Sequence, residues 1–246
     1  WETASLSIAV TPAHKLVVAH GEFSHGGPVR WKPVGFCEAA KIRSTHAVPS
    51  MDGVRGGGWR VFSDDFIRLC AWVMTEGHYR RDRSGEIWIT QSKTHESYVD
   101  QISKLSGSWP SGLMKRWDGR VWCFVVKHEL AALIRALMPD KVPAPTFIAQ
   151  LRRCDLLLFL YEALKGDGSH RSGTLPVLSA PATRKEFWRI LSASVPVLCC
   201  SKQAEADAVQ HMATLCGLRS RFRDDRSHTD YRVAIKKFTN YGYFAK

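Results

Sequence analysis

Apolar positions recur with a helical period in several stretches of the chain, and residues typical of helix ends flank these stretches. "SDDFIRLCAWVMTEG" (63–77) opens with Ser63 and two acids, which favour a helix N-terminus, and stops at Gly77. A second apolar run, "LLLFLYEALKGDG", ends in the same way. The pattern predicts helices over 63–77, 95–107, 127–139 and 156–168.

Strand signals lie between these helices. "GEIWITQS" (85–92) predicts a strand. "LMKRWDGRVWCFVV" (113–126) predicts a hairpin, because Asp118-Gly119 is a preferred type I′ turn pair. The order after residue 62 is therefore helix, strand, helix, hairpin, helix, and a basic β stretch follows near the C-terminus, over 219–238.

Much of this order occurs twice. "CCSKQAEADAVQHMATLCG" (199–217) resembles "TQSKTHESYVDQISKLSG" (90–107) at an offset of 109 residues, whereas Glu76 and Asp167 at the two helix ends are offset by 91. The second copy thus carries about 18 extra residues between Gly168 and Ser201. Such a long period indicates two α/β halves related by a pseudo-twofold axis, not a solenoid.

We expect three segments: a β-rich appendage with a Gly-rich linker (1–58), a first half (59–150) and a second half (151–246). No run of about 18 apolar residues could cross a membrane, and no signal-peptide layout occurs at the N-terminus. The seven cysteines lack CxxC spacing, which favours buried, reduced thiols over a zinc site. These features predict an intracellular protein in a reducing compartment, cytoplasmic or nucleoid-associated.

The chain is strongly basic, with a net charge of +12 and a pI near 9.6. A folded protein this basic usually meets a polyanion, most often nucleic acid. Ribosomal, membrane-surface and heparin-binding proteins share this property, so charge alone does not choose the partner.

The two acidic helix ends suggest a chemistry. If the equivalent helices pack side by side, Glu76 and Asp167 meet across the axis, with the small residues Ala71, Thr75, Ala163 and Gly166 at the contact. Two carboxylates at two helix C-termini repel unless a cation lies between them. Mg²⁺ prefers oxygen ligands and keeps positions open for water and phosphate, which is what phosphodiester hydrolysis requires. The alternative is that each acid merely ends an amphipathic helix before a glycine.

"LCAWVMTEG" and "LYEALKGDG" resemble the two motifs of the LAGLIDADG homing endonucleases, in the single-chain form found in inteins and introns, over about 63–240. The resemblance implies an α+β fold of two αββαββα-like halves, whose antiparallel sheets form a DNA-binding saddle. It also implies a monomeric, site-specific double-strand DNA endonuclease, encoded by a mobile element, that cuts across the minor groove of a long asymmetric site. Glu76 and Asp167 would bind Mg²⁺, and Ca²⁺ would support binding but little cleavage.

The resemblance suggests further catalytic residues. The family has a lysine before the second motif, and Lys141 in "PDKVPAPTFI" matches it. The alternative is that Lys141 is an ordinary surface lysine. Lys236 is a looser counterpart in the second half. Glu162 departs from the family pattern, because it stands where a small residue usually packs. Basic residues near predicted strands are the candidate DNA contacts: Arg80, Arg81, Arg83, Lys93, Arg116, Arg120, Arg171, Arg219, Arg221, Arg223 and Arg232.

"VTPAHKLVV" (10–18) resembles a block of intein-splicing (Hint) domains, with Thr11 and His14 matching. Trp1 and the terminal "GYFAK" lack the groups for splicing, so we expect a relic of such a domain or a plain β-rich appendage. Two other function classes stay open: a non-cleaving binder, such as an RNA maturase or DNA-binding regulator, and an inactive intein fragment. The target site, the number of metals and any role of 1–58 are not fixed by the sequence.

Overall fold

The computed structural model describes residues 61–80, 85–169, 197–225 and 230–237, together with short stretches of the first 47 residues. Most of these stretches are strands. Thr11, His14, the Gly-rich linker, Arg81, Arg83, Arg171 and the 18-residue excess lie outside the described residues. The N-terminal strands are β1 (Glu2–Thr3), β2 (Leu6–Ser7), β3 (Lys15–Glu22), β4 (Arg30–Trp31), β5 (Gly35–Glu38) and β6 (His46–Ala47).

In the rest of the chain, the order helix, two strands, helix, two strands occurs twice. The first copy comprises α1 (Asp64–Glu76), β7 (Gly77–Tyr79), β8 (Ile87–Ser92), α2 (Glu96–Leu105), β9 (Leu113–Trp117), β10 (Val121–Val126) and α3 (His128–Leu137). After α4 (Pro145–Gln150), the second comprises α5 (Arg153–Asp167), β11 (Gly168–Ser169), β12 (Val197–Cys200), α7 (Gln203–Leu215), β13 (Leu218–Asp225) and β14 (Asp230–Lys237). This is the α+β architecture that the sequence predicts.

The two sheets have the same topology. Their strand orders are β7-β8-β10-β9 and β11-β12-β14-β13, all antiparallel. Their registers agree as well, because Gly77 pairs with Ile89 and Gly168 pairs with Leu198. Gly77 and Gly168 are 91 residues apart, and Ile89 and Leu198 are 109 residues apart. These are the two offsets that the repeat in the sequence shows. The internal duplication is therefore confirmed at the level of single residue pairs.

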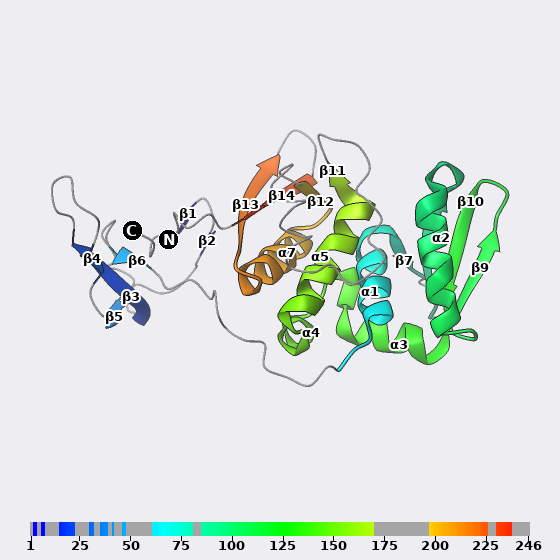
Figure 1. Cartoon of the computed structure of the whole chain (residues 1–246), viewed down its shortest axis with the longest axis horizontal. Helices are drawn as coiled ribbons and strands as arrows, with labels where there is room; N and C mark the ends of the chain where they lie inside the picture. The colour runs from blue at the N-terminus through cyan, green and yellow to red at the C-terminus, as the bar shows by residue number, and fades with distance from the viewer. Residues whose placement is uncertain are drawn as a thin grey trace.

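Helices α1 and α5 lie side by side at the centre, with α2 and α7 on their outer sides (Figure 1). Ser63 caps α1, since its hydroxyl accepts a hydrogen bond from the amide of Phe66 (3.2 Å). Every residue of α5 from Asp155 to Lys165 is buried, as expected for a helix packed on several sides. Large side chains such as Trp72 and Phe159 fill this centre, and each contributes roughly 1.5–3 kcal/mol by leaving water.

The turn of the β9–β10 hairpin differs from the expected type. Gly119 has a φ of +96°, but Asp118 is not among the residues with positive φ. The Asp118 amide donates to the Val121 carbonyl, so the central residues are Gly119 and Arg120, and glycine at the first of them is the type II′ pattern. The type I′ prediction was wrong because the Asp118 carboxylate instead accepts from the amides of Arg120 and Val121.

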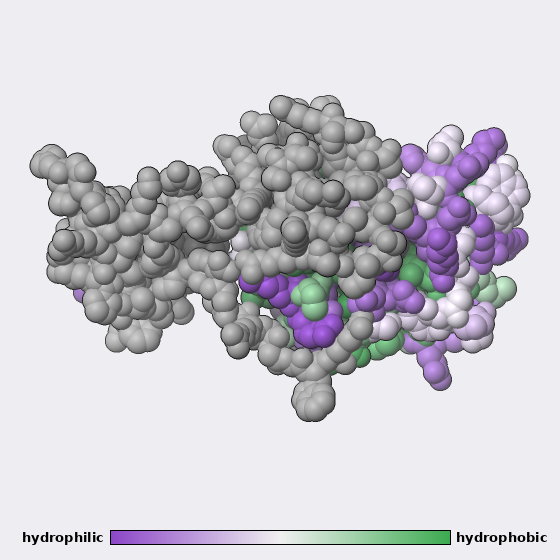
Figure 2. Space-filling model, viewed as in Figure 1, coloured by the Kyte–Doolittle hydropathy of each residue, from purple (hydrophilic) through white to green (hydrophobic). Residues whose placement is uncertain are grey.

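Hydrophilic residues gather over α2 and the β9–β10 hairpin on the face seen in Figure 2. Among the helices of the described residues, none combines the length and apolar character needed to cross a membrane. The six described cysteines are all free, and four of them, Cys70, Cys123, Cys200 and Cys216, are buried.

Candidate active site at the paired helix ends

The last turns of α1 and α5 touch through two small residues. Gly166 lies so close to Thr75 that a Cβ atom built on the glycine would stand 2.7 Å from the Thr75 Cβ, a distance that side chains do not tolerate. Each of these residues directly precedes an acid, Glu76 on α1 and Asp167 on α5. A close contact between the two helices therefore lies next to the two acids, at two of the small residues that the pattern predicts.

Both helices change directly into strands after the acids. Gly77 has φ −78° and ψ 148°, and Gly168 has φ −84° and ψ 133°, so neither adopts the left-handed conformation of a usual glycine cap. Glycine is required at position 77 for space, because a Cβ atom there would lie 2.8 Å from the Cα atom of Val73. The abrupt change holds each acid at a helix–strand junction and at the negative end of a helix dipole.

Glu76 lies half-buried among three polar side chains of the first half. Burial raises the pKa of its carboxyl, while a hydrogen bond from Gln91 and the charges of His95 and Lys141 act in the opposite direction. Gln91 is buried at the end of β8, and His95 stacks on Tyr98 with ring centroids 5.7 Å apart. The carboxylate thus has an amide donor and two nearby nitrogen groups.

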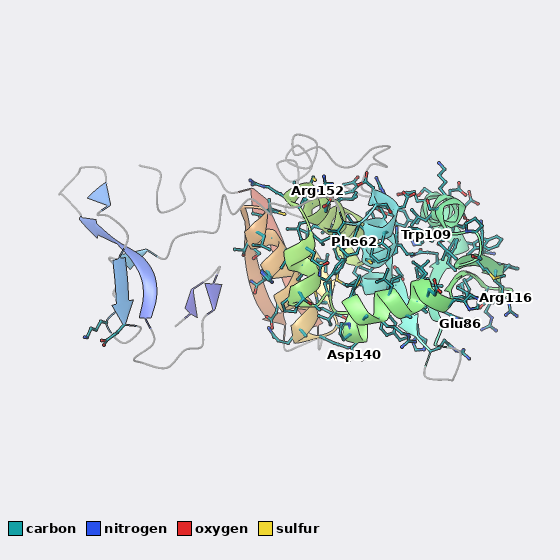
Figure 3. The ribbon with its side chains drawn as sticks, turned by 90° about the horizontal axis from the view of Figure 1, so that it is seen from below. Phe62, Glu86, Trp109, Arg116, Asp140 and Arg152 are labelled. Atoms are coloured by element: carbon teal, nitrogen blue, oxygen red, sulfur yellow. The ribbon has the colours of Figure 1, made fainter. Side chains whose placement is uncertain are left out.

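Lys141 lies in a loop with strained backbone. Asp140 and Lys141 have φ values of 51° and 70°, in the left-handed region that residues with side chains seldom adopt. Two contacts hold this loop: the Tyr79 hydroxyl donates to the Met138 carbonyl (2.6 Å), and Lys202 Nζ donates to the Asp140 carbonyl (3.1 Å). Asp140 lies at the lower edge of the molecule in the view of Figure 3. The loop brings the sequence-predicted Lys141 near Glu76.

Asp167 is exposed and has a different neighbour. Its charge helps to raise the pKa of the Cys200 thiol, after the larger effect of burial. Cys200 occupies in β12 the register position of Gln91 in β8, since Cys200 pairs with Tyr231 where Gln91 pairs with Trp122. By the same register Lys236 in β14 corresponds to Lys127, which follows β10, and not to Lys141.

The residues at the helix ends suit a hard divalent cation. Two carboxylates and the Gln91 amide offer only oxygen ligands, which Mg²⁺ and Ca²⁺ prefer. Within the described residues, no cluster of three or more His, Cys, Asp or Glu could enclose an ion by itself. An ion bound here would complete its coordination with water and phosphate oxygens, which is how Mg²⁺ binds in phosphoryl-transfer sites.

The face of the first sheet that is turned away from the helices carries basic residues. Ile87, Ile89 and Gln91 alternate along β8 toward the helices and are buried. Arg116 pairs with Cys123 on the opposite face, is exposed, and lies at the outer edge of the molecule (Figure 3). On that face Arg80 also stacks over Trp88, 4.7 Å from the ring centroid. Lys93 and Arg120 are exposed in the turns after β8 and between β9 and β10.

The register of the second sheet gives its basic positions one common face. Leu218 and Ser220 of β13 are buried, so the alternate positions belong to the other face. Arg223 pairs with Arg232, and Arg232 pairs with Cys199, which places both arginines at positions of that face. The predicted arginine positions on it are Arg219, Arg221, Arg223 and Arg232.

Gln91 and His95 are residues of this site that reasoning from the sequence missed. A signal for Gln91 existed, because the repeated segments align around Ser92 and Ser201 and place Gln91 directly before the match. His95 has no counterpart in that match, since position 204 is alanine. Its nearness to Glu76 arises from the fold of the 3-10 turn between β8 and α2, which short motifs do not reveal.

Comparisons with known proteins give similarity to solved structures only. No protein-family model matches the chain, and no curated protein matches it. The homing endonuclease I-DmoI is 12% identical, with a TM-score of 0.47 over 70% of this chain and 88% of that one. I-DmoI in complex with DNA and Ca is 13% identical, with a TM-score of 0.46 over 70% and 83%. The N-terminal LAGLIDADG domain of DUF199/WhiA is 12% identical, with a TM-score of 0.41 over 76% and 81%.

Proposed function

We propose that this chain is a metal-dependent, site-specific DNA endonuclease of the LAGLIDADG type. The observation that carries the proposal is the contact between Thr75 and Gly166, which brings the last turns of two duplicated helices together beside Glu76 and Asp167. Two acids at this point are electrostatically unfavourable without a cation. Their presence in both copies of a duplicated motif therefore favours a shared ion-binding role over two unrelated helix ends.

The reaction that fits these residues is hydrolysis of a phosphodiester. A bound Mg²⁺ would supply an activated water and stabilise negative charge on the phosphate. Glu76 and Asp167 would hold the ion by their carboxylates. Gln91 fixes the orientation of the Glu76 carboxylate by its hydrogen bond. Lys141, near Glu76, would orient the attacking water or stabilise charge on a phosphate oxygen.

The basic sheet faces support a double-stranded DNA partner. Arg116 in the first sheet and the arginine positions of β13 and β14 lie on the faces away from the helices, where a duplex would meet them. Arginine at alternate strand positions can contact phosphates or guanine edges in a groove. Because one chain contains both acids, we propose that it acts as a pseudosymmetric monomer on an asymmetric site.

A second candidate is a protein that binds nucleic acid without cutting it. The observation that favours it is the difference between the two acids, since the position of Gln91 near Glu76 is held by Cys200 near Asp167. Loss of a polar group in one half would weaken one of two cuts. We nevertheless favour cleavage, because both carboxylates are retained.

The test is a cleavage selection from a randomised DNA duplex library. The full chain is incubated with the library and Mg²⁺, and newly formed ends are captured by ligation and sequenced. We expect enrichment of one long asymmetric site. The matched control is the double variant Glu76→Gln and Asp167→Asn, which keeps the size of both side chains and should enrich nothing.

Two outcomes separate the candidates. If the chain retains one sequence from the library in a binding selection but releases no new ends with Mg²⁺ or Mn²⁺, the non-cleaving function is correct. If the double variant cuts as fast as the unaltered protein, the two acids do not form the active site.

A further inference from the structure

A buried network of charged and polar side chains crosses the interface between the two halves. Glu162 of α5 accepts hydrogen bonds from Arg68 of α1 and from Lys165 Nζ (2.9 Å) on the same carboxylate oxygen. Lys165 Nζ also donates to the side-chain oxygen of Gln101 on α2 (2.7 Å). The network therefore connects α5 to two helices of the first half.

These charges are removed from water. The side chains of Glu162 and Lys165 are 1% and 0% exposed, and that of Arg68 is 15% exposed. Lys165 Nζ also lies 4.8 Å from the centroid of the Tyr161 ring. Burial of paired charges gives little or no net stability, because the loss of hydration offsets the attraction. A role other than stabilisation is needed to account for this network.

The pseudo-twofold axis shows that the interface does not need these charges for packing. By the offset of 91 residues between the two helices, the counterparts of Glu162 and Lys165 are Ala71 and Met74, and the counterpart of Arg68 is Phe159. All three counterparts are buried and apolar. The same interface thus accepts apolar residues on one side of the axis and a charged network on the other.

The network provides a second point of attachment between α1 and α5. The first point is the contact of Thr75 with Gly166, which is a packing contact without direction. Arg68 and Glu162 meet seven residues earlier on α1 and four residues earlier on α5, about 10 Å and about 6 Å along the axes. A directional contact at this distance from the Thr75–Gly166 contact would resist sliding or rotation of one helix against the other.

We propose that Arg68, Glu162, Lys165 and Gln101 are positioning residues that fix the register of α1 against α5 and so the relative placement of Glu76 and Asp167. The consequence for metal binding rests on the proposed function; the consequence for register does not. In this role Glu162, which departs from the small-residue pattern, belongs to the hydrogen-bond network that aligns Glu76 and Asp167.

The register is measured without metal or DNA. Spin labels introduced as unnatural amino acids at Asp100 on α2 and Asp207 on α7, both exposed, report the distance between the outer helices in the full chain. We compare the unaltered protein with the triple variant Arg68→Met, Glu162→Leu, Lys165→Met. The triple variant should unfold at the same or a higher temperature. Its label distance should shift by about 1.5 Å or more, one residue of helix rise, or its distribution should broaden about twofold.

A milder pair of variants keeps the test decisive if the triple variant does not fold. Gln101→Leu removes one of the two hydrogen-bond acceptors of Lys165 and should broaden the distance distribution. Gln101→Glu keeps an oxygen acceptor for Lys165 and should preserve the narrow distribution. Leu160→Met on α5 is the control for an apolar change in the same buried helix and should leave the distance unaltered.

Mn²⁺ binding to the full chain, monitored by electron paramagnetic resonance, tests whether a change in helix register alters metal binding at Glu76 and Asp167. We expect the triple variant, or Gln101→Leu, to bind Mn²⁺ about tenfold or more weakly than the unaltered protein although its melting temperature is not lowered. An unchanged distance distribution in folded triple and Gln101→Leu variants would overturn the positioning role. If distances change but the unaltered protein binds no Mn²⁺, the proposed metal site fails and the register assignment stands.

Discussion

The two halves of this molecule agree in backbone and differ in chemistry. Gly77 and Gly168 follow the two acids and pair with equivalent residues, Ile89 and Leu198. The surroundings of the acids have nevertheless diverged. Glu76 is half-buried beside Gln91, His95 and Lys141, whereas Asp167 is exposed and has Cys200 at the position of Gln91.

This difference indicates that the two halves have kept their strand register more strictly than the side chains around the acids. A shift of strand register by one residue would turn every buried side chain toward the opposite face, so register is held by the core. Residues at the helix ends pack less and can change in one copy alone. The basic positions also diverged, because Arg221 in the second sheet corresponds to Met114 in the first.

The largest effect should come from the acids themselves. Glu76→Gln and Asp167→Asn each remove one carboxylate that we propose as a metal ligand, without changing side-chain size, and each should lower double-strand cleavage by about 10³-fold or more. DNA affinity should stay within a few-fold, because the phosphate contacts that we propose lie on the sheet faces. Cleavage of an end-labelled duplex measures the first effect and a gel-shift titration the second. Retained cleavage by either variant would show that its acid is not a metal ligand.

Removal of Lys141 should have the next largest effect and should separate the two halves. Lys141→Met should lower the rate of one strand cut about 10²-fold, because the charge of this lysine acts on Glu76. Lys127→Met is the matched control, since Lys127 forms an ion pair with Glu86 (3.7 Å) at the other end of the sheet. Duplexes labelled on each strand in turn give the two rates. Equal loss on both strands would contradict a half-specific role.

Neighbouring residues of β9 offer a direct comparison of the two sheet faces. Arg116→Ala should weaken DNA binding and lower the slope of log affinity against log salt by about 0.9, as expected for one lost phosphate contact. Lys115→Ala should leave the slope unchanged, because Lys115 stacks on Trp122 (4.2 Å) on the opposite face. Titrations at several salt concentrations measure both slopes. A larger change for Lys115 would place DNA on the helical side of the sheet.

An amide side chain at position 200 should make the surroundings of Asp167 more like those of Glu76. Cys200→Gln restores the group that Gln91 provides in the first half, so the slower strand cut should become a few-fold faster. The Cys200 thiol is buried, and the larger side chain should cost about 1–3 kcal/mol of stability through overpacking. Strand-resolved rates and thermal unfolding check the two effects. A further loss of the slower cut would show that the amide has no role at this position.

The smallest effect concerns stability and distinguishes the buried acid from the exposed one. Burial raises the pKa of Glu76 in the folded protein above the ordinary value of 4.5, so the folded state binds this proton more tightly than the unfolded state. Its stabilising effect is present at low pH and is lost as the pH rises through the raised pKa. Glu76→Gln should therefore raise the melting temperature at about pH 7.5 and leave it unchanged near pH 4, more clearly than Asp167→Asn. Equal melting curves for Glu76→Gln and the unaltered protein at neutral pH would contradict this burial.

Much of the fold could be predicted from the sequence, because local signals and the duplication agree. Ser63 and Gly77 bound α1 as expected, and the hairpin and the repeated helices follow their hydrophobic patterns. The turn type was wrong, since the side chain of Asp118 satisfies the turn amides and shifts the central pair to Gly119 and Arg120. No periodicity reports such a local competition for hydrogen bonds.

The residues of the candidate site that the sequence predicted lie in the two motifs, apart from Lys141, which the family resemblance suggested. The contact of Thr75 with Gly166 follows from small residues at matching positions. Gln91 and His95 reach Glu76 through sheet pairing and a 3-10 turn, which are contacts between distant parts of the chain. The pairing of Glu162 with Arg68 was also hidden, because these residues are 94 positions apart and lie on different helices.

The most direct measurement of the central claim is the position of Mn²⁺ in crystals of the full chain, located by anomalous scattering. We predict a peak between the carboxylates of Glu76 and Asp167, with metal–oxygen distances of about 2.0–2.3 Å, that disappears in the Glu76→Gln, Asp167→Asn variant. A peak elsewhere, or carboxylates that point away from each other with no ion between them, would contradict a shared cation site at the paired helix ends.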